Sequence, residues 1–179
     1  MKNPKRTLVL SLLLSLLASC SLPPVTVEIP DQTIPLPAAI DTQGKVLVPK
    51  EGSAFSPPSV VQVKSVTIQG QAELKNPAAL SVTLYATDTD PGNITGCTFI
   101  PGVNLYACNA GAVKKVSNTL VFSQTKKGPI PITITDTDGV LSRGIMQGKI
   151  WFGVQFSNTL TANNELRLKN LSATVKVGF

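Results

Sequence analysis

Hydrophobic and polar residues alternate along most of the second half of the chain. In residues 80–85, Leu80, Val82 and Leu84 share one phase, and the residues between them are polar or amphipathic. The same alternation recurs in 116–122, 130–135, 150–156 and 171–177. Because successive side chains of a strand point to opposite faces, this period of two predicts antiparallel strands with one buried face.

The strand pattern starts at about residue 59, and Gly, Pro, Asn and Asp interrupt it. Its phase slips at Ser65-Val66 and at Asn170-Leu171, where we expect β-bulges. A short helix is predicted only in 139–148. The sequence therefore predicts an all-β fold over 59–179: an antiparallel β-sandwich or jelly roll of about seven to nine strands.

Residues 20–58 differ from this pattern. They contain more than half of the fourteen prolines of the chain and show little periodicity beyond "VTVEI" and "KVLV". Proline fixes φ and favours extended backbone, so this region is predicted to be a stiff proline-rich tether before the domain. In the alternative interpretation parts of it, "KVLV" above all, add strands to the sandwich.

The first nineteen residues have the composition of an export signal. Lys2, Lys5 and Arg6 precede an uncharged, leucine-rich run over 7–19. A membrane-spanning helix needs about 20 apolar residues, so this run is too short to cross a bilayer. A basic start, an apolar stretch and small residues at its end are typical of a signal peptide over 1–19.

The signal ends in a more specific pattern. Leu17-Ala18-Ser19-Cys20 resembles the lipobox of bacterial lipoproteins. The resemblance implies diacylglycerol on the Cys20 sulfur, cleavage before Cys20 and acylation of the new amine, for example with palmitate. Several acyl chains anchor a protein stably without spanning the membrane. Ser21 after the cysteine favours the outer membrane or cell surface in a host with two membranes.

Loss of the signal changes the charge of the protein. The signal carries three cations and no acid, so the net charge falls from +6 to +3. The remaining cations are scattered, without the clustered Lys and Arg of a nucleic-acid-binding face. We therefore expect a single exported domain, held on the membrane by its lipid, with envelope proteins or cell-wall glycans as partners and no nucleic acid.

Cys97 and Cys108 remain after Cys20 is acylated. They flank "TFIPGVNLYA", whose Pro-Gly predicts a turn between short strands at 98–100 and 105–107. In an exported protein this spacing favours a structural disulfide, which would contribute on the order of 2–3 kcal/mol. A redox pair or a zinc site is the alternative, but redox motifs prefer two intervening residues and the chain has no histidine.

Two "TDTD" segments are candidate calcium ligands. Asp88 and Asp90, and Asp136 and Asp138, place carboxylates at alternate positions beside a turn. Oxygen ligands in this arrangement suit Ca²⁺, provided that both turns lie at one end of the fold. In the alternative interpretation, these aspartates only form turns and bind no metal. Calcium is the one cofactor that the sequence suggests, and we expect no other.

Trp151 and Tyr85 are candidate ligand-binding residues, since both fall on the polar phase of their strands. Exposed aromatic rings beside hydrogen-bonding groups stack on sugars or anchor protein interfaces. In the alternative, a neighbouring segment such as the proline-rich region covers them. Because the chain has no histidine, it cannot form a Ser-His-Asp or Cys-His site, and we do not expect an enzyme.

These observations favour a membrane-anchored envelope lipoprotein that acts as a non-catalytic binding or scaffolding module. A carbohydrate-binding module for cell-wall or exported glycans is the second hypothesis, and a calcium-dependent adhesive module is the third.

Overall fold

The computed structural model describes residues 23–38, 42, 44–59, 62–125, 128–157 and 160–178. The predicted signal peptide 1–19 and Cys20 lie outside the described residues. No helix in the described ranges is long and apolar enough to cross a membrane.

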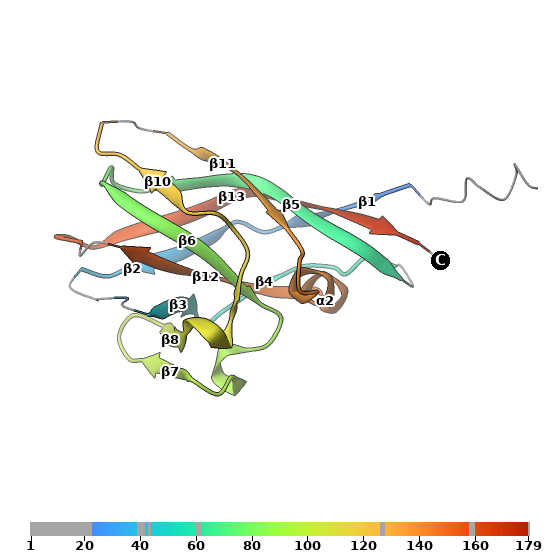
Figure 1. Cartoon of the computed structure of the whole chain (residues 1–179), viewed down its shortest axis with the longest axis horizontal. Coiled ribbons are helices and arrows are strands. Elements are labelled where there is room, and N and C mark those ends of the chain that lie inside the picture. The colour runs from blue at the N-terminus through green and yellow to red at the C-terminus, as the bar shows by residue number, and fades with distance from the viewer. Residues whose placement is uncertain are drawn as a thin grey trace, which may run out of the picture.

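Two antiparallel sheets face each other in a sandwich (Figure 1), so the predicted fold class is confirmed. The first sheet contains β1 (Val25–Ile29), β2 (Gln32–Leu36), β5 (Val63–Leu74), β11 (Ile130–Thr135) and β13 (Asn164–Val177). The second contains β3 (Lys45–Pro49), β4 (Ser53–Ala54), β6 (Leu80–Thr87), β7 (Cys97–Ile100), β8 (Leu105–Asn109), β9 (Lys114–Lys115), β10 (Leu120–Phe122) and β12 (Lys149–Ser157). The helical elements are η1 (Pro91–Asn93), η2 (Ala110–Ala112) and α2 (Val140–Gln147).

The segment expected to be a tether is part of the sandwich. β1 and β2 both pair with β13, while β3 pairs with β8 and β12. The prolines do not prevent this, because Pro30 lies between two strands, Pro35 lies on an edge strand and Pro49 ends β3. The prediction of a tether through residue 58 is thus corrected in favour of its alternative, because the strands of the described residues start at Val25.

The main core fills the space between the sheets. It is built from the inward phase of each strand, and its largest fully buried side chains include Phe152, Leu84, Ile34 and Leu36. Ile34 and Leu36 come from β2, so the proline-rich segment supplies core residues and not only edges. These strands therefore fold with the domain.

Two register shifts interrupt the pairing of β13 with β5. One lies between Lys169 and Ser172, where Asn170 has φ 52°, and it confirms the bulge expected at Asn170-Leu171. The other lies at Lys176–Val177, opposite Ser65 and Val63. Lys64 is the extra residue there, so this bulge lies one residue before the slip expected at Ser65-Val66.

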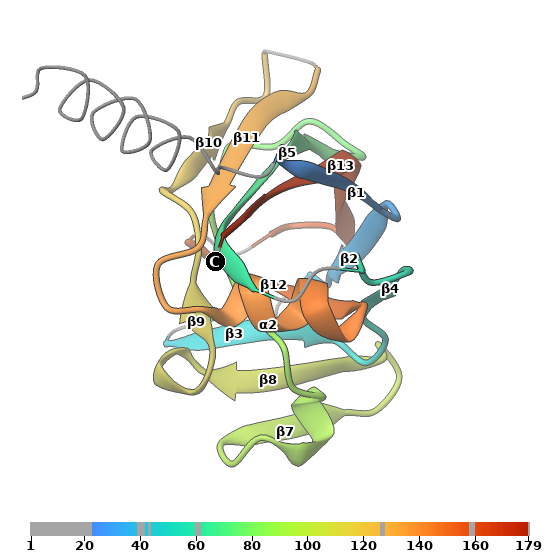
Figure 2. The same ribbon diagram turned by 90° about the vertical axis from the view of Figure 1, so that its right-hand side faces the viewer.

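Helix α2 lies across one end of the sandwich, in front of β12 in Figure 2. It confirms the short helix expected in 139–148. Gly139 (φ 76°) and Gly148 (φ 69°) flank it in the left-handed conformation that glycine adopts easily. Leu141 and Ile145 are completely buried, which fixes the helix on the core.

Candidate functional site

Trp151 and Tyr85 are buried, which favours the interpretation that a neighbouring segment covers them over that of an exposed binding surface. Their exposed fractions are 4% and 7%. They lie on neighbouring strands of the second sheet, where Tyr85 pairs with Gly153 and Trp151 pairs with Thr87. Both point away from the main core, as their phase indicated, but this outer face is itself covered.

A second hydrophobic cluster provides the cover. It joins the two aromatic residues to others from β3, β8 and the segment before β9: Val46, Val48, Cys108 and Val113. Gly52 also approaches the indole so closely that a Cβ there would lie 2.7 Å from a Trp151 ring carbon. Part of the cover therefore comes from the proline-rich segment, as the alternative interpretation expected.

The polar atoms of the two buried aromatic residues have partners inside the protein. The Tyr85 hydroxyl donates to Gln155 Oε1 at 2.9 Å, and Trp151 Nε1 donates to the Lys50 carbonyl at 3.4 Å. The ammonium of Lys149 lies 4.6 Å from the centroid of the Trp151 ring. The indole is thus held by packing, a hydrogen bond and a cation–π contact, and it does not present a free face to a ligand.

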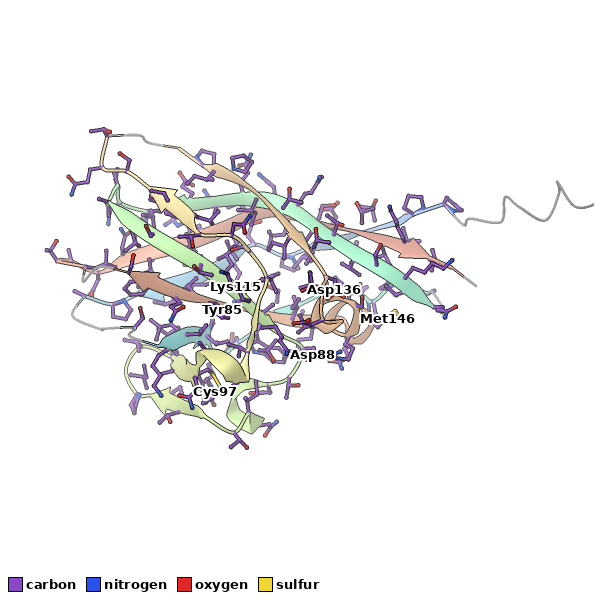
Figure 3. The ribbon with its side chains drawn as sticks, in the orientation of Figure 1. Tyr85, Asp88, Cys97, Lys115, Asp136 and Met146 are labelled. Carbon is purple, nitrogen blue, oxygen red and sulfur yellow. A yellow bond between two sulfur atoms is a disulfide. The ribbon has the colours of Figure 1, made fainter. Side chains whose placement is uncertain are left out.

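The two "TDTD" turns do lie at the same end of the sandwich, but protein groups occupy their carboxylates (Figure 3). Asp136 accepts a hydrogen bond from the backbone N–H of Ser142 at 2.8 Å, and Asp90 accepts one from Gly92 at 2.8 Å. Asp88 pairs with Arg143, and Asp138 lies 3.7 Å from the ammonium of Lys114. These contacts favour the turn interpretation.

Arg143 supplies the positive charge between the two turns. Its guanidinium pairs with Asp88 and also donates to the Asp138 carbonyl at 3.4 Å. In the described ranges, no group of three or more His, Cys, Asp or Glu side chains could hold a metal ion. The calcium hypothesis therefore gains no support from the arrangement of these aspartates.

Cys97 and Cys108 form the predicted disulfide. They are directly opposite each other in the β7–β8 hairpin, whose strands match the predicted ones closely. Figure 3 shows Cys97 on this hairpin, which forms the β7 edge of the second sheet. Cys108 is completely buried in the second cluster, so the bridge links β7 to the strand that contributes to this cluster.

An aromatic pair that was not among the candidate residues lies on the same hairpin. Phe99 and Tyr106 are a cross-strand pair with ring centroids 5.2 Å apart. Phe99 is 38% exposed, and the ammonium of Lys50 lies 5.7 Å from its ring centroid. We call Phe99, Tyr106 and Lys50 the aromatic platform. The phase of Phe99 places it on the same face as Cys97, two residues away, but does not predict its exposure, because Cys97 packs against the second cluster.

A groove of about 370 Å³ lies beside Lys50. Polar residues line it together with two prolines and a valine: Thr33, Pro35, Pro49, Lys50, Glu51, Val103 and Asn104. The Lys50 backbone N–H donates to the Asn104 carbonyl at 3.0 Å, which fixes the hairpin turn to the end of β3. Lys50 thus connects the groove to the aromatic platform.

Acidic and basic side chains are paired on the outer face of the first sheet. Lys169 lies 2.6 Å from Glu73, and Glu165 is contacted by both Lys75 and Arg167. The hydrogen bond from Lys169 lowers the pKa of Glu73, and the hydrogen bonds from Lys75 and Arg167 lower the pKa of Glu165. Carboxyl groups with lowered pKa are ionised at neutral pH, so neither glutamate is suited to act as a general acid.

Comparisons with known proteins give little further information. No family model matches the chain, and no curated protein matches it. A solved structure, that of the xylan-binding module CBM15, matches with a TM-score of 0.40 and 10% sequence identity. The match covers 86% of this chain and 97% of that chain. A similarity this low gives no basis for assigning a ligand.

Proposed function

We propose that this protein is a lipid-anchored, non-catalytic binding module of the cell envelope. The observation that carries the proposal is the position of Cys20, which ends a lipobox-like sequence only five residues before the first strand at Val25. An export signal that ends in an acylated cysteine next to a β-sandwich would place the folded module directly at a membrane. Its partners would be envelope proteins or glycans.

Replacing Cys20 by alanine tests the anchor. The variant should incorporate no radiolabelled palmitate and should lose the mature acylated form, because only the thiol can form the thioether to diacylglycerol. The measurement is palmitate labelling of cells, followed by mass spectrometry of the N-terminal peptide. Ser21→Ala is the matched control and should be acylated normally. An unlabelled wild-type protein, or a labelled Cys20→Ala variant, would contradict the proposal.

Glycan binding is a second candidate function, and the aromatic platform is the observation that favours it. Phe99 presents an exposed ring, the Tyr106 ring braces it, and the disulfide fixes the hairpin that carries both. Lys50 and the polar groove supply hydrogen-bonding groups beside the ring. A rigid aromatic ring next to polar groups is an arrangement that suits sugar rings. In this hypothesis the platform replaces the buried Trp151 and Tyr85.

The Phe99→Ala variant tests this second function. We expect its binding to purified cell-wall glycan to fall at least about tenfold, since truncation of a central aromatic contact typically costs that much or more. The measurement is co-sedimentation of the purified protein with insoluble wall. Val121→Ala is the control, because Val121 is 70% exposed on β10 and is not part of the platform. Equal binding by wild type and Phe99→Ala would exclude a role for the platform in glycan binding.

A further inference from the structure

The connection between the proposed lipid and the sandwich is short. Four residues lie between Cys20 and Val25, and a fully extended chain covers at most about 3.6 Å for each of the five steps, or about 18 Å. Pro23 and Pro24 favour an extended polyproline conformation, which gives about 16 Å at 3.1 Å per residue. If Cys20 carries the acyl chains, the start of β1 lies close to the headgroups, and the module does not stand clear of the membrane.

The pairing of the first sheet defines which end of the sandwich this is. Val25 pairs with Val175 near the end of β13, and the next residue, Lys176, pairs with Ser65 near the start of β5. Lys64 is the extra residue of the bulge at this point. Figure 1 shows the start of β1 and the end of β13 at the same end of the molecule. We call Val25, Lys64, Ser65 and Lys176 the anchor-proximal end.

This end carries two exposed cations. Lys64 and Lys176 are both exposed, and the Lys64 side chain lies over Gly178, where a Cβ would fall 1.9 Å from Lys64 Cε. Within the described residues, neither lysine takes part in an ion pair. The nearest acid along β1 is Glu28, which pairs with Ser172 further from the anchor. The bulge thus adds a second lysine beside Lys176 at the edge nearest Cys20.

We propose that Lys64 and Lys176 hold the anchor-proximal end against the headgroups of anionic phospholipids. The proposal rests on the lipid anchor proposed above. The short connection from Cys20 allows both ammonium groups to approach the membrane surface, whose potential extends for a Debye length of about 8 Å at physiological salt. Each lysine near such a surface strengthens the association about fivefold. The opposite end, with the loop between β12 and β13, then points away from the membrane.

Headgroup quenching of single fluorescent labels tests the orientation. The acylated full-length protein is labelled at Gln62→Cys, near the anchor-proximal end, or at Thr161→Cys, at the opposite end. The native cysteines do not compete, because Cys97 and Cys108 are bridged and Cys20 is acylated. We expect a lipid-headgroup nitroxide to quench the label at position 62 much more than the label at 161, and more in anionic than in zwitterionic vesicles.

The double variant Lys64→Gln/Lys176→Gln should lower the ratio of docked to undocked protein about 25-fold in anionic vesicles. The control variant Lys45→Gln/Lys115→Gln removes the same charge away from the anchor-proximal end and should leave this ratio unchanged. Figure 3 shows the position of Lys115. Equal quenching of the two labels, or no effect of the Lys64/Lys176 pair, would overturn the orientation while the anchor stands. Mass spectrometry of each preparation separates this outcome from failure of the anchor, which would show as unacylated Cys20.

Discussion

Replacement of Trp151 by alanine is expected to lower the free energy of unfolding by about 3–5 kcal/mol, the usual cost of truncating a buried aromatic side chain. The indole is 4% exposed and packs with Val46, Val48 and Val113 under the disulfide hairpin. Its removal would leave a cavity that the paired strands on either side cannot close. The measurement is chemical denaturation followed by far-ultraviolet circular dichroism, because the variant has no tryptophan fluorescence.

Two controls make this result specific. Trp151→Phe keeps most of the buried volume and should cost less than Trp151→Ala. Phe99→Ala removes an aromatic ring that is 38% exposed and should change stability much less, since its ring is only partly removed from water. A Trp151→Ala variant with wild-type stability would show that the indole is not part of a packed cluster, and it would restore Trp151 as a candidate ligand-binding residue.

Alternation along the chain was sufficient to predict the fold class and much of the core. Leu80, Val82 and Leu84 lie in the core between the sheets, as their phase predicts. The bulge at Asn170 was also visible, because a change of phase within one strand requires an extra residue. Both the core positions and the bulge depend on residues that are neighbours in the chain, so they can be predicted directly from the sequence.

The proline-rich segment shows where local composition misleads. The high proline content predicts a tether, yet Pro35 lies in an edge strand and Pro30 lies between two strands that both pair with β13. At these positions the missing N–H of proline does not remove a hydrogen bond from a central strand of the sheet. The alternating stretch at Val25–Ile29 and the apolar run in Lys45–Pro49 carried the correct signal, but their pairing with β13 and β8 depends on residues far away in sequence.

The candidate site was harder to predict for a related reason. Alternation shows that Trp151 and Tyr85 face away from Phe152, but it does not show what covers the second face. The cover comes from residues 94–113, which are distant in sequence from Trp151, and from Val46 and Val48. Conversely, Phe99 lies on β7, the outermost strand of the second sheet, and its ring is 38% exposed.

The disulfide should contribute about 3 kcal/mol to stability. The double variant Cys97→Ala/Cys108→Ala frees a loop with a sequence separation of 11 residues, and the entropy of closing such a loop accounts for this value. A second effect follows from the position of Cys108, which is completely buried beside Trp151 and Val113. Without the bridge, the hairpin would hold this cluster less firmly, so the midpoint of thermal unfolding should fall and Trp151 should become more accessible to water.

Fluorescence separates the two effects, because Trp151 is the only tryptophan in the chain. If the bridge acts only on the unfolded chain, the variant will be less stable but its native emission and quenching by iodide will match the wild type. We expect instead a red-shifted native emission and stronger quenching, since the hairpin that the bridge closes is part of the cover over the indole. Reduction of the wild-type protein under native conditions should reproduce both changes. Unchanged stability and unchanged emission would show that the hairpin keeps its place in the second sheet and in the outer cluster without the bridge.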